Sequence, residues 1–119
     1  MSEYPLRDKT KALALHVIQL VNSLPPNDTG RVIGRQMLRS GTSVGANYRA
    51  SMRAKSSADM LNKLKIVEEE ADETLYWLEL LVAAEVVPLH RLQPLMNEIN
   101  EILAMTVASI KTIRANQRS

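Results

Sequence analysis

Cysteine and phenylalanine are both absent from this chain of 119 residues, and aromatic residues make up only 3% of it. Without cysteine the chain can form no disulfide, no thiolate nucleophile and no cysteine-based zinc or iron–sulfur site. This composition fits a reducing compartment, and we expect a cytoplasmic protein. Because aromatic side chains are scarce, the core must be built from Leu, Ile, Val, Met and Ala, which suits helices.

Long apolar runs are missing as well. No window reaches eighteen consecutive apolar residues, so we expect no membrane-spanning segment. The polar stretch from Met1 to Lys11 lacks the apolar region of a signal peptide. The hydrophobic fraction of 45% and the charged fraction of 24% are ordinary for a folded protein. A chain of this length is one domain, which we place at residues 1–119.

Apolar residues recur at helical spacing in four segments, and no segment alternates in the way that is typical of strands. We expect helices at about residues 6–24, 29–54, 58–87 and 91–116. Four long helices with short connections predict an all-α fold, an antiparallel up-down-up-down four-helix bundle.

Residues at the expected helix ends support these boundaries. Pro25 and Pro88 should each interrupt a helix, because proline donates no backbone hydrogen bond. Asp28 is suited to the N-cap of the second helix, and Ser56 begins an S-x-x-D start signal for the third. Pro94 fits best in the first turn of the fourth helix.

The second predicted helix contains all four glycines of the chain, gathered on one face. Each glycine inside a helix costs about 1 kcal/mol relative to alanine, so a row of them needs a reason. We predict that Gly34, Gly41 and Gly45 permit close packing against another helix. A break near Ser40 is the alternative, and we favour a continuous helix.

Five arginines form a narrow stripe on another face of this helix. At about 100° per residue they project within about 80° of each other, over a length of about 33 Å. We call Arg31, Arg35, Arg39, Arg49 and Arg53 the arginine stripe. Residues 31–65 contain eight Lys or Arg residues and one Asp, whereas residues 66–102 contain nine acidic residues and one Arg. Such segregation favours association with a polyanion or between copies of the chain.

The arginine stripe has two interpretations, which the residues alone leave open. Guanidinium groups bind phosphate oxygens in a bidentate manner, so the stripe, with Lys55 and Lys63, is a candidate nucleic-acid surface. Alternatively the arginines pair with the Glu-rich part of the third helix, within a subunit or across an interface. With few aromatic residues, any nucleic-acid binding should follow the backbone and not the bases.

The third predicted helix is apolar on almost all sides between Leu75 and Val87. Ile66, Trp77 and Leu80 lie roughly opposite its core stripe, and a four-helix monomer would leave them in water. We therefore predict that these three residues form an oligomer interface. The alternative is that loops or the N-terminal segment cover them.

Catalytic patterns are sparse. His16 and His90 are far apart, and no Glu is followed by His three residues later, as a di-metal bundle requires. The acidic residues between Glu68 and Glu73 spread around their helix, which is typical of a solvated or ion-paired face. The phosphate-loop spacing is absent. We expect no enzyme activity, no cofactor, no metal and no small-molecule substrate.

Three stretches, Leu38–Ala50, Arg53–Met60 and Asn62–Glu79, resemble the bacterial family of 23S ribosomal RNA intervening-sequence proteins. That family is similar to the accessory protein of diversity-generating retroelements, a basic ring that binds a reverse transcriptase and nucleic acid. The resemblance implies a four-helix bundle assembled into a homopentameric ring. We therefore expect a non-enzymatic oligomer that binds RNA or a nucleic-acid-bound protein. The alternative is a protein scaffold whose arginines form intersubunit ion pairs.

Overall fold

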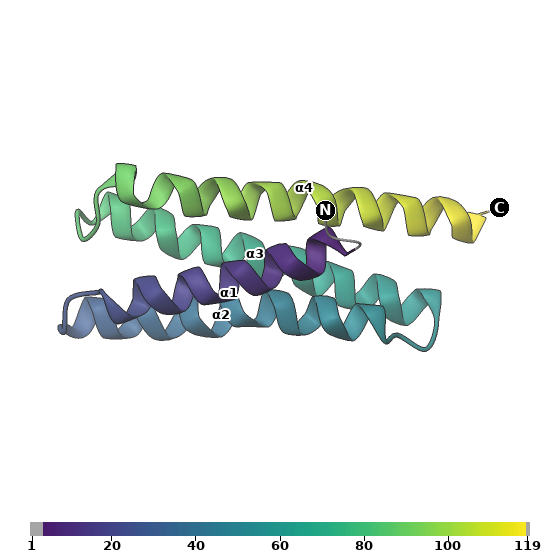
Figure 1. The fold of residues 1–119 in the computed structure, drawn as a ribbon, viewed down its shortest axis with the longest axis horizontal. Coiled ribbons are helices and arrows are strands. Elements are labelled where there is room, and N and C mark those ends of the chain that lie inside the picture. Colours follow the sequence, from purple (N-terminus) through teal and green to yellow (C-terminus); the bar gives the residue numbers. More distant parts are fainter. Residues whose placement is uncertain (1–3, 119) are drawn as a thin grey trace.

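The computed structural model describes residues 4–118, which form four α-helices and no strand (Figure 1). The helices are α1 (Pro5–Asn22), α2 (Asp28–Met52), α3 (Ser57–Ala83) and α4 (Leu89–Arg118). Each helix packs against the next in the chain, and α1 also packs against α4. The prediction of an all-α chain of four helices is confirmed, and these contacts are those of an up-down-up-down bundle. Residues 1–3 and 119 of the predicted domain lie outside the described residues.

Aliphatic side chains from all four helices fill the core, as the scarcity of aromatic residues required. The fully buried members share the inward-facing helical spacing of their own helix, and they include Leu13 and Val17 of α1, Met37 and Val44 of α2, Leu78 and Leu81 of α3, and Ile99 and Ile102 of α4. The bundle that encloses them measures 52 × 24 × 24 Å.

Helix α2 continues through Ser40 and Gly41 without a break, and Gly34, Gly41 and Gly45 face α1. A Cβ atom on Gly41 would lie 2.9 Å from Cγ2 of Val17. A Cβ on Gly34 would lie 3.3 Å from Cγ1 of Val21. A side chain at either position would therefore push against a stiff β-branched residue of α1.

Gly45 leaves more space for a Cβ atom than Gly34 and Gly41 do, and Gly30 leaves less. A Cβ on Gly45 would lie 3.4 Å from the carbonyl oxygen of Thr10, which is an ordinary contact. A Cβ on Gly30 would collide with the carbonyl oxygen of Pro25, in the loop that joins α1 to α2. Gly30 therefore leaves the least room for a side chain. The sequence placed it on the glycine face, but we did not include it among the residues predicted to permit close packing.

The N-terminus of α2 differs from the sequence expectation by one residue. Asn27, not Asp28, is the N-cap: its backbone is extended and its side chain accepts a hydrogen bond from the Gly30 N–H at 2.9 Å. Asp28 lies in the first turn and pairs with Arg31. At the start of α3 the expected Ser56 cap is present, and its hydroxyl accepts a bond from the Asp59 N–H at 3.1 Å.

Helix α3 ends at Ala83, four residues earlier than expected, because a local motif closes it. The N–H of Val86 donates to the Leu81 carbonyl and the N–H of Glu85 donates to the Val82 carbonyl. These two bonds form a Schellman motif, in which the residue at the position of Glu85 takes a left-handed conformation. Glu85 has φ 59°, a conformation that usually selects glycine.

Helix α4 begins at Leu89, so Pro94 lies in its second turn and not in the first, where we expected it. The Arg91 N–H donates to the Pro88 carbonyl at 3.1 Å, which starts the helix before Pro94 is reached.

Helix α1 is much shorter than the other three. Its 18 residues correspond to about 27 Å, whereas the 30 residues of α4 correspond to about 45 Å. In Figure 1 the first turn of α1 accordingly lies near the middle of the bundle, and α2, α3 and α4 extend past it. An open hollow of about 380 Å³ lies between these three helices, lined by Met52, Met60 and Ile113 among others.

Candidate nucleic-acid interface

The arginine stripe lies on the solvent side of α2, and all five of its members are exposed. They point away from the core because Met37 and Val44 occupy the inward face of the same helix. The structure nevertheless divides them by what each guanidinium contacts.

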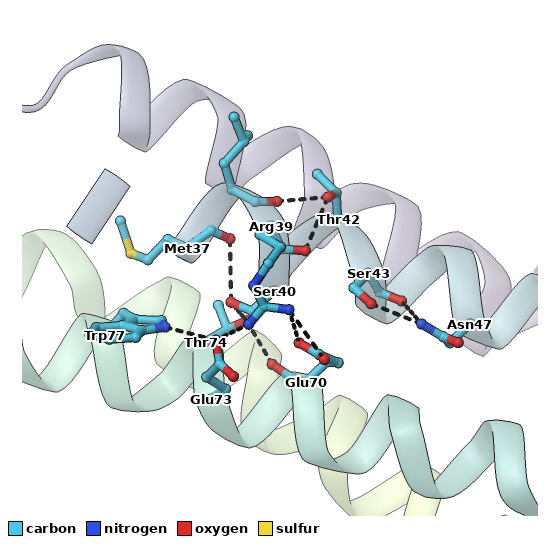
Figure 2. A network of polar contacts seen from close by, with 11 residues as sticks. Met37, Arg39, Ser40, Thr42, Ser43, Asn47, Glu70, Glu73, Thr74 and Trp77 are labelled. Carbon is cyan, nitrogen blue, oxygen red and sulfur yellow. Dashed lines mark hydrogen bonds and ion pairs between the residues drawn. The ribbon is translucent and has the colours of Figure 1, made fainter. Parts of the chain in front are cut away.

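Arg39 is committed to the neighbouring helix α3 (Figure 2). Its guanidinium donates to Glu70 at 3.1 Å and also to the Glu73 carboxylate, and Glu73 in turn accepts a bond from the Trp77 indole at 3.1 Å. These contacts raise the pKa of Arg39, chiefly through the hydrogen bond to Glu73. Since the Arg39 side chain is 50% exposed, we assign the pairs no more than about 1 kcal/mol.

A buried hydroxyl pair lies directly beneath this network. The Ser40 and Thr74 hydroxyl groups are 2.7 Å apart, and both residues are completely buried. The Thr74 hydroxyl also donates to the Glu70 carbonyl at 2.8 Å. The pair fixes the register of α2 against α3 and so sets Arg39 opposite its two carboxylates.

The two arginines nearest the α1–α2 loop behave differently from each other. Arg31 pairs with Asp28 at 2.6 Å and donates to the Pro26 carbonyl at 3.2 Å. Arg35 is exposed and forms no ion pair with any residue between 4 and 117. Of these two arginines, Arg35 is the one left without an ion-pair partner in the described part of the chain.

Arg49 and Arg53 lie on the rim of a hollow that has a volume of about 810 Å³. Arg7 and Lys11 of α1 line the same hollow, which we call the basic hollow. Lys11, Arg49 and Arg53 are exposed and form no ion pair within the described part of the chain. Sequence reasoning missed Arg7 and Lys11, although their spacing of four residues places them on one face of α1.

The remaining predicted basic residues are separate from this hollow. Lys55 is exposed in the connection between α2 and α3, and Lys63 is half-buried on α3. Neither side chain forms an ion pair with a described residue.

The three apolar residues predicted to face solvent are half-buried. Trp77 and Leu80 pack partly against the core, and Ile66 is also intermediate in exposure. Two other apolar side chains are more exposed: Tyr76 is 53% exposed and forms an edge-to-face contact with Trp77, and Val32 of α2 is 59% exposed. We call Val32, Ile66, Tyr76, Trp77 and Leu80 the α2–α3 patch.

One acid–histidine contact resembles part of a catalytic triad. Nδ1 of His16 lies 2.8 Å from Glu98, and Ser23 lines the same hollow. However, Ser23 is the C-cap of α1, seven residues after His16 and so about 10 Å further along the helix axis, and its hydroxyl donates to the Leu20 carbonyl. The histidine therefore does not reach this hydroxyl, and the contact ties α1 to α4 together with the Lys9–Glu101 pair at 2.7 Å.

Among the described residues no three His, Cys, Asp or Glu side chains are grouped so that they could hold a metal ion. Within the same residues, none of the four helices combines the length and apolar character needed to cross a membrane.

Comparisons with known proteins agree with the fold. The family model described as 23S rRNA-intervening sequence protein matches residues 3–108. The chain is also similar to a crystal structure of a protein of unknown function from the S23 ribosomal protein family of Bacteroides thetaiotaomicron, with 39% sequence identity and a TM-score of 0.85. The match covers 89% of this chain and 98% of that one. A comparison with curated proteins finds no match. The resemblance seen in the sequence is confirmed: the chain belongs to the family of 23S rRNA-intervening sequence proteins.

Proposed function

We propose that this protein is a non-enzymatic, self-associating helical bundle that binds RNA, alone or within a ribonucleoprotein, through the solvent face of α2. The observation that carries the proposal is the set of exposed arginines that pair with nothing described, namely Arg35, Arg49 and Arg53. Protein cations that contact phosphates release counterions from the nucleic acid, and this release drives association. The family's link to an intervening sequence of 23S rRNA supports RNA as the polyanion.

The test is RNA affinity measured across a salt series for two triple variants. The first replaces Arg35, Arg49 and Arg53 with Gln, and the second replaces three exposed cations of α3 and α4, Lys65, Lys111 and Arg114, also with Gln. The two variants have the same net charge. If each stripe arginine contacts one phosphate of a single strand, the salt slope should shrink by about 2 in the first variant and stay unchanged in the second. Equal losses in both variants would contradict the proposal.

We further propose that the α2–α3 patch joins copies of the chain, in a ring of five as the family resemblance implies. Val32 lies two helical turns before Ser40, and Leu80 lies nearly two turns after Thr74. Because α2 and α3 are antiparallel and Ser40 meets Thr74, Val32 and Leu80 lie at the same end of the pair. Burying a patch of this kind removes apolar side chains from water.

Light scattering tests the assembly directly. The wild type should form a closed oligomer at micromolar concentration, and Leu80→Asp should dissociate it while helicity is retained. Leu15→Asp on α1, where Leu15 is 52% exposed and lies off the patch, is the matched control and should leave the oligomer intact. A monomeric wild type would refute this part of the proposal.

A protein scaffold without nucleic-acid binding is the second candidate, and the Arg39 contacts favour it. One member of the stripe already pairs with α3 carboxylates in the same subunit, so others could pair with carboxylates of a second copy. In that case the Arg35, Arg49 and Arg53 triple variant should lose assembly, and the wild type should bind no RNA at physiological salt.

A further inference from the structure

We infer that the basic hollow between α1 and α2 is a channel for consecutive backbone phosphates of one nucleic-acid strand. This inference rests on the proposed function and adds a site, two α1 residues and a ligand length to it. The hollow's volume of about 810 Å³ exceeds that of three other hollows on the described chain, which measure about 390, 380 and 250 Å³.

Cations from two different helices line the hollow. Arg7 and Lys11 are one turn apart on α1, Arg49 lies in the last turn of α2, and Arg53 is the C-cap residue four positions later. Between them lie small side chains such as Ala14 and Ala46, together with Gly45, so the centre of the hollow is uncovered. An anion can therefore approach from solvent and be contacted from both sides.

The packing of α1 on α2 spaces these cations along the channel. Gly45 lies against Thr10, so the neighbouring Lys11 is roughly level with Gly45 in the antiparallel pair. Arg49 and Arg53 follow one and two turns further along α2, at about 6 and 12 Å. These are spacings between backbone positions, and a single phosphate group can occupy only part of such a row of cations. Successive phosphates of a strand can contact all of them.

Most of the positive charge in the channel is not compensated within the described chain. Lys11, Arg49 and Arg53 form no ion pair there, and Arg7 has a weak contact of 3.5 Å with Asp8 while lying over the Tyr4 ring. The charge of Arg7 also reaches α2, since it partly offsets the rise that burial causes in the pKa of Tyr48. Only Asp8 among the lining residues opposes an anion.

The residues that line the channel also indicate that it does not recognise bases. None of the described residues that line it is aromatic, so the channel offers no ring on which a base could stack. Binding should therefore depend on the number of phosphates and not on the sequence of bases. This favours an oligonucleotide over a mononucleotide.

The experiment compares Arg7→Gln/Lys11→Gln with Lys65→Gln/Lys111→Gln, a pair of equal charge change on α3 and α4. Both are titrated with a fluorescent 12-nucleotide oligo(U) in a salt series. Loss of two phosphate contacts should shrink the salt slope by about 1.4 and weaken binding about tenfold at 0.15 M salt. The control pair should bind as the wild type does, and uridine monophosphate should not compete at equal phosphate concentration.

Asp8→Asn supplies a result that misfolding cannot imitate, because removal of this carboxylate from the channel should tighten binding. If Arg7→Gln/Lys11→Gln binds like the control pair while the Arg35, Arg49 and Arg53 triple variant is impaired, the channel is refuted and the proposed function stands. If the wild type binds no oligo(U) at 0.15 M salt, the proposed function fails and the channel fails with it.

Discussion

Alanine substitutions along the glycine face of α2 should separate into a stabilising and a destabilising group, according to the space that α1 leaves. Every such substitution gains about 1 kcal/mol of helix propensity. At Gly45 the new Cβ would meet the Thr10 carbonyl at 3.4 Å, an ordinary contact, so most of this gain should be realised. Gly45→Ala should therefore raise the free energy of unfolding by up to about 1 kcal/mol.

At Gly41 an added Cβ atom has less space than at Gly45. The new Cβ would lie 2.9 and 3.0 Å from the two methyl groups of Val17, which has little rotamer freedom in a helix. Overpacking costs about 1–3 kcal/mol, which exceeds the propensity gain in most of that range. Gly41→Ala should therefore lose about 1 kcal/mol net.

Gly30→Ala should be the most damaging of the series. Its Cβ would collide with the Pro25 carbonyl oxygen, which is backbone and can yield only if the α1–α2 loop moves. Movement of that loop would also disturb the hydrogen bond from Gly30 N–H to the Asn27 side chain. We expect a loss of about 2–3 kcal/mol.

Urea and thermal unfolding of the three variants at several protein concentrations measure these differences, since association adds to apparent stability. Each 1 kcal/mol should shift the melting temperature by about 4 °C in a domain of this size. The expected order of stability is Gly45→Ala above wild type, then Gly41→Ala, then Gly30→Ala. If Gly41→Ala were as stable as Gly45→Ala, the close packing of α1 on α2 would be refuted.

Three further predictions concern other parts of the bundle. Glu85→Gly should raise the free energy of unfolding by about 1 kcal/mol, because glycine adopts the left-handed conformation of the Schellman motif without strain. Urea titrations measure this gain, and its absence would contradict the left-handed conformation of Glu85. Thr74→Val should cost about 1–3 kcal/mol, because the Ser40 hydroxyl loses its partner at 2.7 Å and keeps only the longer contact of 3.4 Å to the Met37 carbonyl. Adding Ser40→Ala should cost less than the sum of the two single changes, and strict additivity would show that the two hydroxyl groups do not interact. Arg39→Gln should lower stability by no more than about 1 kcal/mol and leave the RNA salt slope unchanged; a smaller slope would show that Arg39 contacts phosphate.

The sequence contained enough information for the four helices, because their apolar spacing and the prolines between them are local signals. It was less informative about where helices stop. Glu85 follows the end of α3 in a left-handed conformation that glycine usually adopts. Because no glycine stands there, the sequence gives no local signal for the end of this helix. The position of Pro94 likewise led to a wrong prediction of where α4 starts, because the hydrogen bond that begins this helix joins Arg91 to Pro88.

The candidate site was predictable only in part, for a related reason. The arginine stripe follows from the periodicity of one helix. That Arg39 forms ion pairs while Arg49 forms none within the described chain depends on the register between α2 and α3, which the buried Ser40–Thr74 pair fixes. The addition of Arg7 and Lys11 depends on how α1 lies over α2. Both are contacts between distant segments, and no local pattern encodes them.

If the unpaired cations of α2 bind RNA phosphates, the affinity of the wild-type protein for RNA must fall as the salt concentration rises. A plot of log Kobs against log salt for a single-stranded RNA should be linear, with a slope of about −2 or steeper if at least Arg35, Arg49 and Arg53 each contact one phosphate. A flat plot, or no measurable binding at 0.15 M salt, would contradict the claim and favour the protein scaffold.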